Sequence, residues 1–421
     1  MSKKLFFHPT TIFILLIAAA VLFWSKDFSY PSQPYFDEVY YVPAINEYLK
    51  GNIEAYDFHY QKQPGLPYDW THPPLGRLLG VIGVAGFGNN SFGWRITGLV
   101  LGLSSLVVFY LLAKKLFPGS KVVPLASLFL FIFDLLPLVH ARAMMLDIYL
   151  LFFALLSVLM LLSYLNKSNW IKLALLGLLM GCTIATKWNG VFVVGLVFSL
   201  IFVRRLKEKR FYLPHYLAEI GVLTLTAVGV YLASYSQYFW LGGSIGNWLN
   251  LQKQMWQYHA GLKAMHTYQA DWWGWPLMLR PTWYFVERFP TEARNIYALG
   301  NPIIWWTGLV SLPFLGVSWV VKRNFAWGLI LLGYLSAWLP WSLSPRIGFL
   351  HYYLFSLPFL YLSLGWALSW LLARLGKWGR GIVLVYLLAV LTSFLYFYPI
   401  TTGERLTYKQ LEERFWFSSW K

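Results

Sequence analysis

The sequence predicts an all-α polytopic membrane protein with about eleven transmembrane helices. Of its 421 residues, 58% are hydrophobic and only 12% are charged, and the apolar residues form long continuous runs. A soluble protein is typically about a quarter charged, and a bilayer about 30 Å thick needs roughly 17 to 25 apolar residues per helical span. Because the runs do not alternate, helices are predicted and not barrel strands.

The predicted spans, in chain order, are residues 9–24, 92–113, 122–140, 145–163, 170–185, 189–203, 215–239, 302–321, 325–343, 350–372 and 381–398. The short runs 170–185 and 189–203 fit either one long broken helix or two tilted helices. The first run also fits a signal peptide, since lysines precede it. An uncleaved first span is preferred, because the small residues 18–20 lie inside the run and not at its end.

Basic residues predict the orientation of these spans, because short cytoplasmic connections collect lysine and arginine. Those in the connections predicted to be cytoplasmic are Lys3 and Lys4; Lys114, Lys115 and Lys121; Lys167 and Lys172; Arg204, Arg205, Lys207, Lys209 and Arg210; Lys322 and Arg323; and Arg374, Lys377 and Arg380. This pattern favours two crossings within 170–203 and a cytoplasmic N-terminus. It also accounts for the net charge of +17, so a nucleic-acid partner is not expected.

We expect a single transmembrane domain over residues 1–421. It contains two long exoplasmic loops, 25–91 and 241–301, and a C-terminal part, 302–421, that ends in a short exoplasmic tail. Loops of this length are usually functional or disordered. Residues 271–285 are dense in tryptophan and proline and are expected to form an amphipathic belt at the interface. Cys182 is the only cysteine, which excludes a disulfide within the chain.

The second and third residues of the stretch FDEVYY are adjacent carboxylates, Asp37 and Glu38, on the predicted outer face. Neighbouring carboxylates in a partly desolvated cleft repel each other, which raises at least one pKa and provides a base near neutral pH. Alternatively, the two acids simply favour the start of a helix. His72, in the stretch THPPLGRLLG, belongs either to the same site or to the beginning of a surface helix.

Four basic residues lie near the outer ends of different spans, where membrane orientation does not require them: Arg95, Arg142, Lys187 and Arg346. A single basic residue at such a place is usually an anchor at the membrane surface. Four of them indicate an anion site, and phosphate suits arginine and lysine. Arg142 has a second interpretation, in which it pairs with Asp147.

No metal-binding motif is present. His259 and His266 are seven residues apart, a helical spacing, but no third ligand accompanies them. A divalent ion held by Asp37 and Glu38 is the less remote of these two metal sites. We therefore expect neither a metal nor another cofactor.

Taken together, the motifs resemble those of the protein O-mannosyltransferases, multispan glycosyltransferases of the GT-C architecture that take a sugar from a polyprenyl phosphate. The matching stretches, in family order, are FDEVYY, HPPLGRLL, RAMMLD, TKWNG, YHAGLKAMHTYQADWWGWPLMLRP, GNPIIWW and FLHYYLFSLPF. The acidic pair also occurs in other lipid-phosphate glycosyltransferases, whereas HPPLG and WPLMLRP indicate the bacterial branch. The chain lacks the extra luminal domain of eukaryotic members, so their acceptor preferences are not carried over.

The resemblance implies an inverting transfer of mannose from polyprenyl-phosphate-mannose to Ser or Thr hydroxyls of exported polypeptides. It implies that Asp37 is the catalytic carboxylate, that Glu38 supports it, and that basic residues such as Arg95 bind the carrier phosphate. We assign Arg95, Lys187, Arg346 and Arg142 to the phosphate, and His72, His266, His351, Tyr352 and Asp147 to the cleft or the acceptor. The expected location is the plasma membrane, with the site on the exoplasmic face.

Two other functions remain open at the sequence level. A related GT-C enzyme would transfer its sugar to a lipid such as lipid A, or to a glycan, and the HPPLG and WPLMLRP stretches argue against it. A lipid-linked sugar transporter would place polar residues on broken helices at the midplane. Here the charged residues fall at the outer ends of spans, which suits a transferase better.

Overall fold

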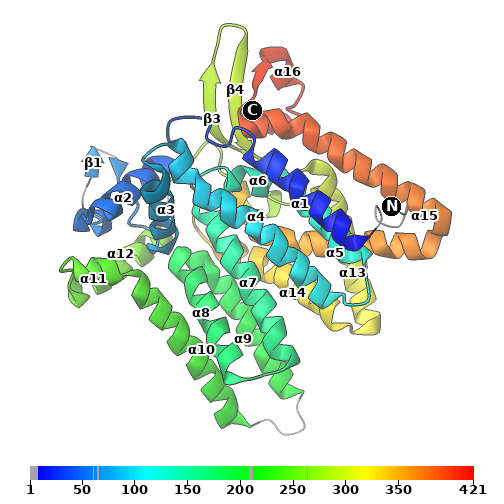
Figure 1. Cartoon of the computed structure of the whole chain (residues 1–421), viewed down its shortest axis with the longest axis horizontal. Coiled ribbons are helices and arrows are strands. Elements are labelled where there is room, and N and C mark those ends of the chain that lie inside the picture. The colour runs from blue at the N-terminus through cyan, green and yellow to red at the C-terminus, as the bar shows by residue number, and fades with distance from the viewer. Residues whose placement is uncertain (1–7, 60, 64–65, 208–211, 263) are drawn as a thin grey trace. The chain divides into compact units, whose positions relative to one another are not determined.

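The computed structural model describes residues 8–59, 61–63, 66–207, 212–262 and 264–421. It is 74% helical (Figure 1). The chain divides into two compact units, unit 1 with residues 1–31, 102–142 and 264–421, and unit 2 with residues 32–101 and 143–263. Among the basic residues used to predict orientation, Lys3, Lys4, Lys209 and Arg210 lie outside the described residues.

Unit 2 consists mainly of helices. Its elements are α2 (Glu38–Lys50), η1 (Ile53–Tyr56), the short strands β1 (Gln61–Gln63) and β2 (Leu66–Pro67), α3 (Leu75–Phe87), the beginning of α4 (Ser91–Leu116), α7 (Leu146–Asn166), α8 (Trp170–Thr186), η2 (Trp188–Gly190), α9 (Val191–Leu206), α10 (Leu213–Ser234), α11 (Ser236–Trp240) and α12 (Ile245–Gly261). The run 170–203 forms two helices, α8 and α9, which are separated by η2.

Helix α8 packs closely against α10, which Figure 1 shows beside it in green. A Cβ atom on Gly177 would lie 2.8 Å from the Leu223 carbonyl oxygen, and one on Gly181 would lie 2.7 Å from that of Ala227. Small residues four apart let two helix backbones approach in this way, as is common between transmembrane helices. The stretch GLLMG of α8, residues 177–181, therefore forms the contact with α10.

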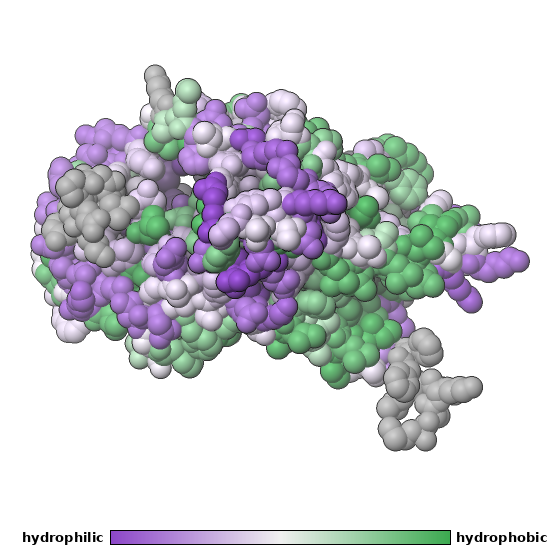
Figure 2. Space-filling view, turned by 90° about the horizontal axis from the view of Figure 1, so that it is seen from above, coloured by the Kyte–Doolittle hydropathy of each residue, from purple (hydrophilic) through white to green (hydrophobic). Residues whose placement is uncertain are grey.

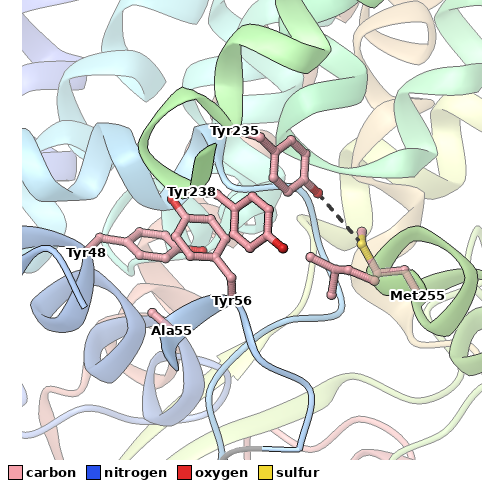
Figure 3. Packing of buried hydrophobic residues seen from close by; sticks show 7 residues of the cluster. Tyr48, Ala55, Tyr56, Tyr235, Tyr238 and Met255 are labelled. Atoms are coloured by element: carbon pink, nitrogen blue, oxygen red, sulfur yellow. Dashed lines mark hydrogen bonds between the residues drawn. The ribbon is translucent and has the colours of Figure 1, made fainter. Parts of the chain in front are cut away.

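A cluster of tyrosines forms the core between α2, η1, α10, α11 and α12 (Figure 3). Tyr48 stacks on Tyr56 with ring centroids 4.6 Å apart, and Tyr56 meets Tyr238 edge to face at 5.4 Å. Met255 of α12 is fully buried here and accepts a hydrogen bond from the Tyr235 hydroxyl. Large aromatic side chains thus fix α12 against α2 and α10.

Unit 1 contains the other long helices and a small sheet. Its elements are α1 (Pro9–Ser25), the end of α4, α5 (Val122–Ile132), α6 (Leu135–Ala141), η3 (Trp272–Gly274), β3 (Thr282–Arg288), β4 (Glu292–Ala298), α13 (Pro302–Lys322), α14 (Phe325–Trp338), η4 (Leu339–Leu343), η5 (Leu350–Phe355), α15 (Leu357–Thr402), β5 (Arg405–Thr407), α16 (Tyr408–Glu412) and η6 (Ser418–Trp420). Helix α15 packs against α5, α13 and α14.

The predicted span 122–140 corresponds to α5 and α6, which are bent by 61° at a break. Asp134 lies at the break and begins α6 by accepting a hydrogen bond from the Leu136 amide. Its carboxylate also accepts from the Trp305 indole at 2.6 Å and from the Tyr361 hydroxyl at 2.7 Å. These donors stabilise a buried carboxylate that a straight helix would leave without them.

The all-α prediction is also incomplete. Strands β3, β4 and β5 form an antiparallel three-stranded sheet in unit 1, and Figure 1 shows β3 and β4 as a hairpin. Strand β3, with the sequence TWYFVER, is rich in aromatic and β-branched residues, which favour strands. The predicted amphipathic belt, residues 271–285, overlaps β3 at residues 282–285.

Seven helices among the described residues are long and apolar enough to cross a membrane, or eight if α5 and α6 form one span. Helices α1, α3 and α8 are apolar but shorter. The predicted spans 350–372 and 381–398 both fall in or next to α15, which starts only at Leu357 and has non-helical backbone angles at Gly376. Hydrophobic side chains, green in Figure 2, lie openly on the surface, as lipid contact requires. The chain is a multi-pass membrane protein; the count of eleven spans stays a prediction.

Candidate functional site

The acidic pair lies at the beginning of α2 in unit 2. Asp37 is the N-cap residue, and Glu38 is the first residue of the helix. Phe36, just before them, has a φ of 50°, a left-handed conformation that a bulky residue rarely adopts. Such strained residues cluster at functional sites. The turn leaves the Asp37 carboxylate partly exposed, while Glu38 is fully buried.

Asp37 has the electrostatic environment of a base. The Tyr41 hydroxyl, one helical turn later, donates to the Asp37 carboxylate at 3.3 Å. The pKa of Asp37 is raised to about 6, chiefly by burial and also by the negative charges of Asp147 and Asp69, whereas the Lys187 ammonium and the Tyr41 hydrogen bond lower it. A base is most effective when its pKa lies near the working pH.

Glu38 is held by four donors. Arg95 of α4 grips both carboxylate oxygens, with its Nε and one terminal nitrogen each 2.8 Å away. The backbone amides of Met144 and Tyr35 donate to the same carboxylate at 2.7 and 3.2 Å. Both members of the ion pair are fully buried. Glu38 is therefore placed to hold the turn that presents Asp37.

A second buried ion pair joins α7 to the end of α8. The Lys187 ammonium lies 3.0 and 3.1 Å from the two carboxylate oxygens of Asp147. Lys187 directly follows α8, and Asp147 is in the first turn of α7. Lys187 and Asp147 are both predicted site residues. Asp147 pairs with Lys187, whereas the sequence suggested a pair with Arg142.

His72 lies on the segment that leads into α3. Its ring stacks on His259 of α12, with centroids 5.3 Å apart and planes 11° from parallel, and approaches the Tyr41 ring at 6.4 Å. His259 Nε2 is 2.7 Å from the Thr71 carbonyl oxygen. Arg77 supports the same segment by donating to the His72 carbonyl oxygen.

Sequence reasoning did not select several of these supporting residues. Arg77 contacts the Asp69 carboxylate at 3.3 Å and lies over the Tyr48 ring. Tyr41 carried a usable signal, because residues four apart on a helix lie on the same face. His259 was considered only as a metal ligand, because its contacts with Thr71 and His72 join segments that are distant in sequence. Asp69 was not selected, although its partners Thr71 and Arg77 are close in sequence.

The other predicted residues belong to unit 1. Arg346 lines a pocket together with Asp271, Gln269, Ser344 and the indoles of Trp272, Trp275 and Trp341. Tyr352 stacks on Trp341 at 4.6 Å. An arginine surrounded by tryptophans and hydrogen-bonding groups can hold an anion whose remainder is apolar.

His351 and His266 meet around one aromatic ring near this pocket. Phe349 stacks on the His351 ring at 5.6 Å and meets the His266 ring edge to face at 5.2 Å. His351 also contacts His140 of α6, whose Nε2 lies 3.2 Å from the Tyr284 hydroxyl. His140 and Tyr284 are further residues that the sequence did not indicate.

Arg142 also has a structural role, at the end of α1. Its guanidinium donates to the backbone carbonyl oxygens of Trp24, Lys26 and Asp27, where α1 ends. The last carbonyls of a helix need such donors, and a cation is favourable beside them. These contacts make Arg142 a cap of α1, and its assignment to the carrier phosphate stays a prediction.

Comparison with known protein families identifies the family of the chain. Residues 12–242 match the family of dolichyl-phosphate-mannose-protein mannosyltransferases, and residues 244–420 match the C-terminal four-transmembrane region of protein O-mannosyltransferases. The chain belongs to the protein O-mannosyltransferase family. It is accordingly a membrane-bound glycosyltransferase, as its motifs led us to expect.

Curated relatives in the protein O-mannosyltransferase family are bacterial and eukaryotic. The polyprenol-phosphate-mannose–protein mannosyltransferase of Mycobacterium tuberculosis is 26% identical over 92% of this chain and 87% of its own length. That of Mycolicibacterium smegmatis is 27% identical over 92% of this chain and 88% of its own. The dolichyl-phosphate-mannose–protein mannosyltransferase 1 of Saccharomyces cerevisiae is 29% identical over 42% of this chain and 24% of its own.

Solved structures show that the protein O-mannosyltransferase fold extends to other GT-C enzymes. The chain resembles the Saccharomyces cerevisiae Pmt1-Pmt2 complex bound to its sugar donor, with a TM-score of 0.80, 15% identity, and coverage of 98% of this chain and 92% of that one. It also resembles ArnT from Cupriavidus metallidurans bound to undecaprenyl phosphate, with a TM-score of 0.61, 18% identity, and coverage of 89% and 62%. These likenesses establish the GT-C fold.

Proposed function

We propose that the enzyme transfers mannose from polyprenyl-phosphate-mannose to Ser or Thr hydroxyls of exported polypeptides, with Asp37 as the general base. The observation that carries the proposal is the environment of Asp37: a partly exposed carboxylate at a strained helix start, with a pKa of about 6, in a protein O-mannosyltransferase. Curated bacterial relatives are named for the same donor and a protein acceptor.

The reaction needs one base and no general acid. Asp37 takes the proton of the acceptor hydroxyl while the oxygen attacks the anomeric carbon of mannose, and the bond from that carbon to the phosphate oxygen breaks. The polyprenyl phosphate leaves with the electron pair as a weakly basic anion, so it requires positive charge and not a proton. Attack opposite to the leaving group inverts the anomeric centre. One working carboxylate and nearby cations therefore suffice.

The cations for the phosphate are not equivalent. Arg346 lines a pocket in unit 1, which makes it the strongest choice for the donor phosphate. Arg95 pairs with Glu38, and Lys187 pairs with Asp147. Either residue can bind the phosphate only if it contacts the phosphate and its carboxylate partner at the same time. Glu38 acts as a positioning residue for Asp37 in this scheme. We assign His72 in unit 2, and His266, His351 and Tyr352 in unit 1, to binding of the acceptor.

The proposed topology has eleven spans, a cytoplasmic N-terminus, and the base on the exoplasmic face of the plasma membrane. The basic residues of the cytoplasmic connections support it. So does the length of α15: 46 residues are about 69 Å of helix, roughly twice what one crossing needs. The break at Gly376 divides this helix into two parts of crossing length.

The direct test is mannose transfer by the purified protein in liposomes, with polyprenyl-phosphate-mannose and a Ser/Thr-rich peptide. Asp37→Asn removes the base, so we expect kcat/KM to fall by about 10²–10⁴ or more. The same change removes a charge that burial penalises, so the midpoint of thermal unfolding at pH 7.5 should stay equal or rise.

Ser91→Ala, at the first residue of α4 and outside the proposed site, serves as the control and should keep full activity. Undiminished transfer by Asp37→Asn refutes the base. Consumption of the donor without labelling of the peptide shows a lipid or glycan acceptor instead. No consumption by the wild-type protein refutes the donor.

A further inference from the structure

We propose that α12 is an interfacial helix that lies on the bilayer surface and thereby positions the segment carrying His72. Helix α12 has 17 residues and is not among the helices apolar enough to cross a membrane. One side of it is nevertheless built like a membrane-contacting surface. This inference adds a lipid contact and a positioning role to the proposed function, and it has its own test.

The two apolar sides of α12 have different surroundings. Leu251 and Met255 are buried in the tyrosine cluster, and Figure 3 shows Met255 pointing to Tyr235. In contrast, Ile245, Leu249 and Trp256 are 68%, 56% and 66% exposed. At 100° per residue these three lie within about 40° of one another on the helix surface. We call them the outer stripe.

The occupant that fits the outer stripe is lipid. Tryptophan with isoleucine and leucine is the apolar composition of helices that lie in the membrane interface. The stripe has no acidic residue, and the exposed Lys253 beside it can extend its ammonium to headgroups. The position in the chain agrees, because the candidate span α10 ends at Ser234, eleven residues before α12 begins, and the intervening Trp240 is 87% exposed.

The same helix holds the His72 segment. His259, near the end of α12, contacts the Thr71 carbonyl oxygen through Nε2 and stacks on the His72 ring. His72 in turn lies beside Tyr41, which donates to the proposed base Asp37. Met255 and Leu251 fix α12 in the core of unit 2. The depth of α12 in the bilayer therefore sets the height of the His72 segment above the bilayer.

Adjacent positions on α12 offer matched probes. Asn250 and Gln257 are exposed like Leu249 and Trp256 but point about 100° away from them. Four single-cysteine variants, Leu249→Cys, Trp256→Cys, Asn250→Cys and Gln257→Cys, are made in a Cys182→Ser background and carry a nitroxide label. The full-length proteins are placed in nanodiscs of phosphatidylcholine and phosphatidylglycerol. Power-saturation EPR then compares collisions with oxygen, which enters lipid, and with a soluble nickel chelate.

We expect labels at 249 and 256 to collide mainly with oxygen, and labels at 250 and 257 to collide mainly with nickel. Aqueous accessibility at all four positions overturns the proposal. So does an outer stripe that is aqueous in nanodiscs and becomes protected only when a Ser/Thr-rich peptide is added, since the occupant is then polypeptide. Peptide mannosylation by each labelled variant shows that the variant is folded. If the wild type does not transfer mannose, the proposed function fails, but the EPR result still tests the position of α12, because it does not depend on transfer.

Discussion

At the scale of single residues, two adjacent carboxylates acquire different roles from their surroundings. We had expected mutual repulsion to raise one pKa. The Glu38 charge is instead matched by Arg95, and the pKa of Asp37 rises first because of burial and then because of Asp147 and Asp69. Two carboxylates that are given different roles by their different surroundings are typical of acid–base sites. The exposed partner is the one free to exchange protons.

Asp37 predicts the acidic limb of the pH profile. The deprotonated carboxylate is the active form, so kcat/KM should be constant above its pKa of about 6 and fall about tenfold per pH unit below it. Neighbouring charges should move this limb in opposite directions. Lys187→Met removes a charge that lowers the Asp37 pKa and should move the limb to higher pH, whereas Asp147→Asn removes one that raises it and should move the limb to lower pH.

The measurement is kcat/KM against pH for wild type and both variants, with each profile scaled to its own plateau. Scaling separates the shift from losses that follow when a buried ion pair is broken, which costs about 3–5 kcal/mol of stability. Shifts in the same direction, or a limb that neither change moves, would contradict the assignment of Asp37.

At the scale of elements, close packing of two helices fixes the end of α8 where Lys187 lies. Helix α8 ends at Thr186, and Lys187 follows at the turn into α9. The contact with α10 depends on Gly177 and Gly181, which let the backbones approach. Within lipid the hydrophobic effect does not drive helices together, because lipid tails are as apolar as the side chains. This contact therefore relies on van der Waals packing. The ion pair with Asp147 therefore depends on a steric feature elsewhere in α8.

Gly181→Ala should destabilise this contact. The added Cβ would lie 2.7 Å from the Ala227 carbonyl oxygen and 2.7 Å from Val230 Cβ, neither of which can rotate away. Overpacking of this kind costs about 1–3 kcal/mol. Gly221→Ala in α10 adds its Cβ to open space and should be neutral or slightly stabilising. Thermal unfolding in one detergent compares the two, and equal midpoints would show that α8 and α10 do not pack this closely.

At the scale of the whole molecule, the predicted site residues fall into two groups. Unit 2 contains Asp37, Glu38, His72, Arg95, Asp147 and Lys187, and unit 1 contains Arg142, His266, Arg346, His351 and Tyr352. The proposed base and its supports thus share one unit, whereas the pocket with Arg346 is in the other. Each unit is assembled from separated stretches of chain, which is why sequence proximity groups these residues poorly.

The topology of α15 is testable at this scale. If the helix makes two crossings with a break at Gly376, Arg380 faces the cytoplasm and the chain end at Lys421 faces outward. Single cysteines at these two exposed positions, in a Cys182→Ser background, should react differently with a membrane-impermeant maleimide in right-side-out vesicles. Labelling is expected at 421 and, only after the membrane is permeabilised, at 380. Equal labelling of both in sealed vesicles would reduce the number of spans.

The sequence by itself determined the membrane class, the approximate position of most helices and the family. Hydrophobic runs report burial in lipid directly, and motifs such as HPPLG are contiguous, so they can be recognised without the fold. The helix start at Asp37 was also readable, because acids favour a first turn. The sheet of β3, β4 and β5 was missed, since 106 residues lie between the end of β4 at Ala298 and the start of β5 at Arg405, and their pairing has no local signal.

Only the tertiary structure decided which charges meet. Arg95 reaches Glu38 across 57 residues and Lys187 reaches Asp147 across 40, so two of the four basic residues predicted for the phosphate hold carboxylates. Arg142 caps α1 across more than a hundred residues. Composition and spacing show that cations gather at the ends of spans. The choice of partner follows from which helices pack together, because a buried charge is stabilised only by a donor or acceptor within hydrogen-bonding distance.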